Sequence, residues 1–70
     1  MKSKKYDYFV NVKELLHPLG ENNFSAVAII REIRGGEIDH NLKEIFGETR
    51  EEVYKNMKNI IEQWIKINEK

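Results

Sequence analysis

The sequence has no cysteine and only one proline among its 70 residues. Without cysteine, neither a disulfide nor a thiolate-bound metal can staple so small a chain. Its 12 Lys and Arg residues balance 12 Asp and Glu residues, and a net charge of zero argues against a domain that coats nucleic acid. No apolar run approaches the about 18 residues that a membrane span needs. We therefore expect one small domain over residues 1–70, located in the cytoplasm.

Residues that carry catalysis or bind metals are few. The candidates are Ser3, Ser25, Thr49, His17 and His40. A hydrolytic Ser/His/Asp site needs three such groups to converge, and nothing in their order or spacing favours it. The two histidines match no metal-ligand motif. We therefore expect a protein that is not an enzyme and that uses neither a metal nor another cofactor.

Two segments in the first half of the chain favour β-strands. Between Tyr6 and Val12 apolar and polar side chains alternate, which is the period of a strand with one buried face. Residues 24–33 are rich in β-branched side chains and nearly continuous in apolar character, which favours a strand inside the sheet. The segment between them, His17–Asn23, contains a proline, a glycine and two asparagines, and so predicts a turn.

A third strand is predicted after the pair of glycines at positions 35 and 36. Two glycines between strand-like runs supply the positive φ angles of a two-residue hairpin turn. The chain would then run back as a strand from Ile38 to about Phe46. The apolar residues of this segment also fit helical spacing, so a helix stays open as the alternative.

The last third of the chain has the pattern of an amphipathic helix. Thr49 and Glu52 form a capping box, which places the helix start at Arg50. Apolar residues then recur at steps of three and four up to Asn68. They are Val53, Met57, Ile60, Ile61, Trp64 and Ile67. The whole chain therefore predicts an α+β fold, with a three-stranded antiparallel sheet packed against one long C-terminal helix in the order β-β-β-α.

The second strand points to a binding surface, because both of its sides are apolar. The small side chains of Ala26 and Ala28 suit the side against the helix, and one helix covers only one face of the sheet. The other side then needs cover from a protein partner or a second copy of the chain. Its residues are Phe9, Val27, Ile29 and Ile33. The alternative is that the loop 15–23, with Leu15, Leu16 and Leu19, folds over this side and completes the core.

Charge is uneven along the chain, and this suggests a competing function. Residues 1–13 contain four lysines and one aspartate, so they carry +3 while the remainder carries −3. Together with Tyr6 and Tyr8 as stacking rings, the cations would form a basic sheet surface for nucleic acid. These cations are Lys4, Lys5, Lys13, Arg31 and Arg34. The alternative is that the tyrosines face the core and the lysines are simply solvated.

One motif supports the protein-binding interpretation. The segment from Phe46 to Val53, Phe-Gly-Glu-Thr-Arg-Glu-Glu-Val, resembles the strand-to-helix junction of HicB-like antitoxin domains, which also follow the order β-β-β-α. This resemblance implies a non-catalytic protein that binds and blocks a small toxin ribonuclease, usually as an oligomer.

Two further likenesses concern other parts of the sequence. Tyr6-Asp7 and the segment from Ile45 to Thr49 are similar to short phage inhibitors of uracil-DNA glycosylase. The sheet-plus-helix order is also similar to the amino-terminal domains of phage integrases, which bind DNA through the sheet. We therefore expect a small protein-binding module, antitoxin-like or of the phage-inhibitor type, that docks on a partner protein or self-associates. The alternative is a nucleic-acid-binding domain.

Overall fold

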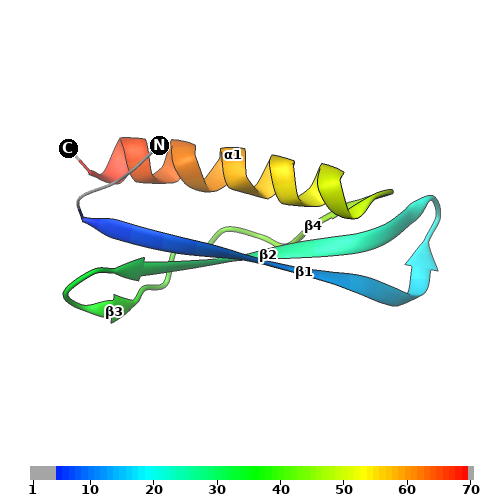
Figure 1. Ribbon diagram of the computed structural model, residues 1–70, viewed down its shortest axis with the longest axis horizontal. Helices are drawn as coiled ribbons and strands as arrows, with labels where there is room; N and C mark the ends of the chain where they lie inside the picture. Colours follow the sequence, from blue (N-terminus) through cyan, green and yellow to red (C-terminus); the bar gives the residue numbers. More distant parts are fainter. Residues whose placement is uncertain (1–4, 70) are drawn as a thin grey trace.

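The computed structural model describes residues 5–69, apart from the side chains of Pro18 and Leu19. The elements are β1 (Tyr6–Leu19), β2 (Asn22–Glu32), β3 (Gly36–Glu37), β4 (Ile45–Gly47) and α1 (Arg50–Asn68). β2 is the central strand, because it pairs antiparallel with β1 along one edge and with both β3 and β4 along the other. α1 lies lengthwise over one face of this sheet (Figure 1). The α+β fold expected from the sequence is confirmed.

The β1–β2 hairpin is longer than the sequence predicted. β1 continues to Leu19, so the turn predicted for His17–Asn23 narrows to the two residues that separate Leu19 from its partner Asn22. Gly20 leads this turn with a φ of 66°, a conformation that favours glycine at the first position of a two-residue hairpin turn. β1 passes through Pro18 in a bulged stretch, because residues 15–18 have no partner in β2 and the missing N–H leaves no ladder bond unmade.

The β2–β3 hairpin exists, but its turn has three residues rather than two. Glu32 pairs directly with Gly36, and the backbone N–H of Gly35 donates to Glu32 O at 3.0 Å. Gly36 has a φ of 93°, so the glycine pair does supply the positive φ that returns the chain.

The third strand predicted from Ile38 to Phe46 is largely wrong, and so is the helical alternative. Residues 38–44 have neither strand nor helix structure, and only Ile45–Gly47 pairs with β2 as β4. Asn41 has a φ of 59°, which interrupts an extended chain. The imidazole of His40 takes the place of a backbone donor, because its Nε2 lies 2.8 Å from Ala28 O on the edge of β2.

The helix prediction is confirmed at both ends. Thr49 Oγ1 accepts a hydrogen bond from the Glu52 N–H at 3.1 Å, and the Glu52 side chain accepts from the Glu48 N–H at 2.7 Å. α1 packs on β1 and β2 through one apolar stripe. The buried core contains Tyr6, Val10, Ala26, Ala28, Ile30, Val53, Met57, Ile61 and Ile65. Two residues of the predicted stripe, Ile60 and Ile67, are exposed instead.

Gly47 joins β4 to the start of α1 at close range. A Cβ at this position would lie 2.8 Å from Val53 Cγ1 and would also contact the Glu52 carboxylate. Real side chains do not approach so closely, so a residue without a side chain is required here. The junction between sheet and helix therefore depends on a glycine for close packing, although its backbone needs no positive φ.

Candidate protein-binding surface

The two faces of the sheet have different surroundings. The pairs Val10–Ala28 and Val12–Ala26 belong to the face under α1, where Ala26 and Ala28 are buried as predicted. Since successive side chains of a strand point to opposite faces, the intervening pairs Phe9–Ile29 and Asn11–Val27 lie on the other side. We call this side the open face. Its apolar residues are Phe9, Val27, Ile29, Ile33 and Phe46.

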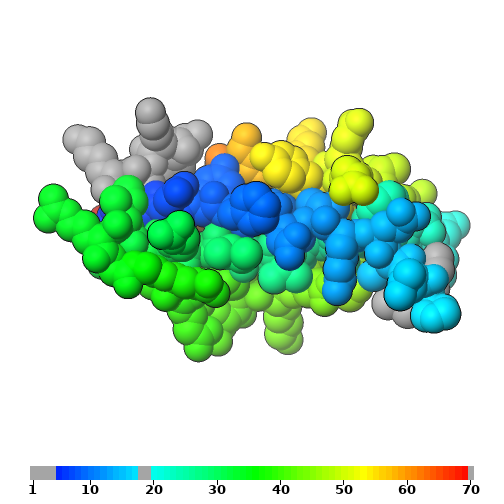
Figure 2. All heavy atoms as spheres, turned by 60° about the horizontal axis from the view of Figure 1, so that its bottom comes forward, coloured from blue at the N-terminus to red at the C-terminus, as the bar shows by residue number. Residues whose placement is uncertain are grey.

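The described part of the chain covers the open face only in part, at Ser25, which is fully buried. Phe9 is 60% exposed, while Val27 and Ile29 are half-buried between their neighbours. Figure 2 brings this side of the molecule forward and shows β1 and β2 at the surface, with α1 behind them. The alternative that loop 15–23 covers this face is wrong for Leu16, which lies in β1 and is 93% exposed. The Leu19 side chain lies outside the described residues.

Ile33 extends the open face beyond the end of β2. Its backbone N–H donates to Lys5 O at 3.0 Å, which continues the β1–β2 alternation by one further pair. Its side chain therefore follows Ile29 and Arg31 along the same row, and it is 58% exposed. The four predicted binding residues thus share one face, with Ile33 at its end and Phe9 on the neighbouring strand.

Phe46 belongs to this surface and was not predicted. It pairs with Ser25 in β4 and is 41% exposed. The Ser25 side chain beside it is fully buried, and its hydroxyl has no hydrogen-bond partner among the described residues. The signal was present in the sequence, because Ile45 and Phe46 alternate across a strand that ends at Gly47. The prediction of one longer strand over residues 38–46 did not separate this short strand from the segment before it.

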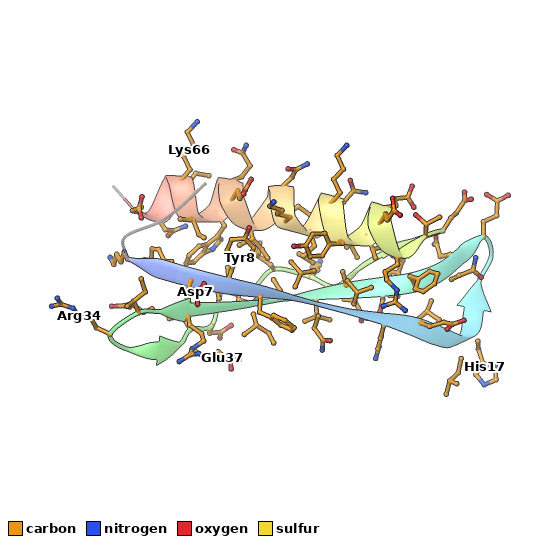
Figure 3. All side chains as sticks on the ribbon, in the orientation of Figure 1. Asp7, Tyr8, His17, Arg34, Glu37 and Lys66 are labelled. Carbon is orange, nitrogen blue, oxygen red and sulfur yellow. The ribbon has the colours of Figure 1, made fainter. Side chains whose placement is uncertain are left out.

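The cations proposed for nucleic-acid binding do not form one patch. Lys5 and Arg34 lie near the β2–β3 turn, where they line a common hollow, and Figure 3 shows Arg34 at that end of the molecule. Lys13 follows Lys5 by eight residues, which corresponds to a distance of roughly 25 Å in an extended strand. In the strand register, Arg31 lies directly opposite Asp7 of β1 on one side and Glu37 of β3 on the other. Lys4 lies outside the described residues.

The tyrosines of β1 face the helix, so they offer no stacking platform. Tyr6 is buried and meets the Trp64 ring edge to face, with 5.2 Å between the ring centroids. Tyr8 lies on the same face, turned towards α1 (Figure 3). Burial raises the pKa of the Tyr8 phenol, and the nearby Glu62 carboxylate, which accepts its hydrogen bond, raises this pKa further. The exposed phenyl ring of β1 is Phe9, which lies opposite Ile29 and between Asp7 and Asn11 on the same face.

Three of the five residues considered for catalysis cap a helix, are buried or are hydrogen-bonded in the structure. Thr49 caps α1, and Ser25 is inaccessible. His17 is exposed in β1, and Ser3 lies outside the described residues. Both ring nitrogens of His40 are engaged, since Nδ1 accepts the Leu42 N–H at 2.9 Å and Nε2 lies against Ala28 O. This arrangement assigns the proton to Nε2. Within residues 5–69, three or more His, Asp or Glu side chains nowhere gather as a metal would require.

No protein-family model matches the chain, and no curated protein and no solved structure matches it significantly. The likeness to HicB-like domains at residues 46–53 therefore stays a prediction. In the described part of the chain, no helix has the length and apolar character to span a bilayer.

Proposed function

We propose that this protein is a non-catalytic binding module whose open face docks on another protein. The observation that carries the proposal is the group of apolar side chains on the open face, in which Phe9 on the edge strand β1 is 60% exposed. Aromatic residues are enriched in the buried centres of protein interfaces. Arg31 lies between Ile29 and Ile33 and directly opposite Asp7, so these two charges separate Ile33 from the rest of the group. Together with Lys13 they would supply the polar contacts of the interface.

The dimensions of the open face suit a small docking site. The molecule measures 39 by 19 by 16 Å, and the open face lies within that outline. Each partner contributes about 800 Å² to a standard interface, so we expect a docking site at the small end of the range for specific complexes.

We further propose an antitoxin-like or phage-type inhibitor that acts by covering a partner enzyme. Support comes from the resemblance at Phe46–Val53, a segment that contains Phe46 of the open face and leads directly into α1. A partner of this kind would present an apolar patch to Phe9, Ile29 and Phe46. The cytoplasmic location stays a prediction. We put forward no nucleic-acid function, because acidic residues lie opposite Arg31 on both neighbouring strands, and Lys13 lies far along β1 from Lys5 and Arg34.

Site-specific photo-crosslinking in the native host tests this proposal. A photoreactive side chain at Val27 lies within the open face, and β1 separates it from the outer edge of the sheet. The same group at Lys55, which is exposed on α1, is the matched control. We expect a discrete adduct with a second protein from position 27 and none from position 55. The adduct should disappear when Phe9→Glu is added and the chain remains folded by circular dichroism.

Three results would contradict the proposal. The first is equal labelling from both positions, and the second is an adduct that persists with Phe9→Glu. The third is an adduct that contains only a second copy of this chain. Binding to nucleic acid that falls steeply with salt, and that Phe9→Glu leaves unchanged, would favour the competing function instead.

A further inference from the structure

The outer edge of β1 from Tyr6 to Glu14 is a second surface, which adjoins the open face at Phe9. β1 is the terminal strand of the sheet order, and over these nine residues it pairs with β2 without a register shift. No described segment runs along its other side. A long, regular and unprotected strand edge is a template for pairing with another strand.

The hydrogen bonds of β2 show which groups of β1 point outwards. Ala28 O and Ile30 O bind His40 and the Ile38 N–H, so they face away from β1. Their partners Val10 and Tyr8 therefore belong to pairs that exchange no backbone bonds with β2, and their N–H and C=O groups point to the outer edge. The Tyr8 N–H is consistent with this direction, because it donates to its neighbour Asp7 Oδ1 at 2.8 Å.

A groove accompanies this edge. It has a volume of about 430 Å³ and lies between β1 and the first turns of α1. Residues 9–12 of β1 line it on one side, and Arg50, Glu51 and Tyr54 of α1 line it on the other. Phe9 therefore belongs both to this groove and to the open face. Tyr54 is 46% exposed. A strand added beside Val10 and Val12 would therefore gain apolar contacts as well as backbone hydrogen bonds.

We propose that a second copy of this chain occupies the edge, with β1 pairing antiparallel to β1 about a two-fold axis at Val10. In this register Asp7 of each copy lies opposite Lys13 of the other, on the side of the open face. Tyr8 lies opposite Val12, and Phe9 lies opposite Asn11. Opposite charges placed directly across two strands stabilise the pair. The Asp7 carboxylate, which binds its neighbour's N–H in the single chain, would exchange that bond for the interstrand pair.

The neighbouring registers lack this complementarity. An axis at Phe9 would place Lys5 opposite Lys13, and like charges directly opposite are unfavourable. An axis at Asn11 would place Asp7 opposite Leu15 and Lys13 opposite Phe9, which forms no ion pair. The charges of β1 therefore select the axis at Val10 from the registers around the middle of the edge.

The position of α1 leaves room for this dimer. α1 contacts β4 as well as β1 and β2, so its axis runs near β2, the central strand. Strands lie about 4.8 Å apart, which would separate the two helix axes of the dimer by about 14 Å, wider than the roughly 8–10 Å of packed helices. The two helices would therefore not collide, and the two Tyr54 side chains would lie in the space between them.

This inference goes beyond the proposed function, because the edge and the open face are different surfaces. Pairing at β1 joins the two sheets into one and leaves Val27, Ile29 and Phe46 uncovered. The dimer would present a docking face twice as large, and its failure to form would leave the proposed function of the single face intact.

Sedimentation equilibrium of the purified full chain, from micromolar to millimolar concentration, tests the dimer. Asp7→Lys and Lys13→Asp each turn two attractive pairs into repulsive ones, and each should weaken dimerisation by about tenfold or more. An equimolar mixture of the two variants should restore a dimer of near wild-type affinity. In the mixed dimer the introduced lysine faces the introduced aspartate, and the unchanged Asp7 of one copy faces the unchanged Lys13 of the other. Loss of folding cannot explain such a rescue.

The matched controls are Asp39→Lys and Lys55→Asp, which make the same charge changes at exposed positions away from this edge. Both should dimerise as the wild type does. A wild type that stays monomeric at millimolar concentration would overturn the inference. So would a dimer that is insensitive to both β1 variants, or a mixture of these variants that fails to associate.

Discussion

Replacing His40 with alanine removes two hydrogen bonds that hold residues 38–44 against the sheet. The ring binds Ala28 O at 2.8 Å and accepts the Leu42 N–H at 2.9 Å, both in partly buried surroundings. Each hydrogen bond contributes about 1 kcal/mol net, and a buried partner left unsatisfied costs about 1–3 kcal/mol. We expect His40→Ala to lower the free energy of unfolding by about 2–4 kcal/mol.

This loss is large for a chain of 70 residues, whose total stability should be about 4–10 kcal/mol. The melting temperature should fall by more than about 10 °C, since 1 kcal/mol corresponds to about 4–8 °C in a domain of this size. Thermal and urea unfolding followed by circular dichroism measure the two quantities. His17→Ala is the matched control, because His17 is exposed near the far end of β1 (Figure 3) and should change stability by less than about 0.5 kcal/mol. Equal effects of the two substitutions would refute the role assigned to His40.

Two further predictions concern the packing of α1. Gly47→Ala should destabilise the protein by about 1–3 kcal/mol, because the added methyl group would collide with Val53 Cγ1 and the Glu52 carboxylate; an unchanged urea midpoint would show that this junction can relax. Tyr8→Phe should become less harmful above pH 10, because the unfolded chain ionises Tyr8 near its ordinary pKa of about 10 while the folded protein holds the proton to a higher pH. Below about pH 10 the folded and unfolded states both hold the proton, and its contribution to stability is complete. Between about pH 10 and the raised pKa this contribution is lost as the pH rises. A difference in the free energy of unfolding between wild type and variant that stays constant from about pH 7 to 11 would contradict this.

The elements that the sequence predicted best are those with local signals. α1 begins and ends at the predicted residues because Thr49 supplies a side-chain cap and the apolar period runs without interruption. β2 was recognised as an interior strand because both of its sides are apolar, and it pairs on both edges. The shared face of Phe9, Val27 and Ile29 follows from strand alternation once these two strands are paired in register.

The elements that the sequence did not predict depend on contacts between distant residues. The chain from 38 to 44 leaves β2 because the His40 side chain, rather than its backbone, satisfies Ala28 O, and no local pattern indicates that exchange. β1 passes the proline because its pairing with β2 is irregular between Glu14 and Leu19, which depends on the register of the two strands. The sequence also did not distinguish Ile65 from Ile67, because both are equally apolar. Only the packing of α1 on the sheet buries Ile65, which follows Ile61 on the same helix face, and leaves Ile67 exposed.

The central claim is that the open face binds a protein, and the affinity of variants for the crosslinked partner tests it most directly. Phe9→Glu and Ile29→Glu place charge within the face, while Ile67→Glu makes the same change at an exposed position of α1. Isothermal titration with the purified partner should show a loss of about thirtyfold or more for Phe9→Glu and Ile29→Glu, and an unchanged affinity for Ile67→Glu. Because Phe9 is largely exposed, its variant should remain folded even if Ile29→Glu does not. Unchanged affinity for a folded Phe9→Glu variant would contradict the claim.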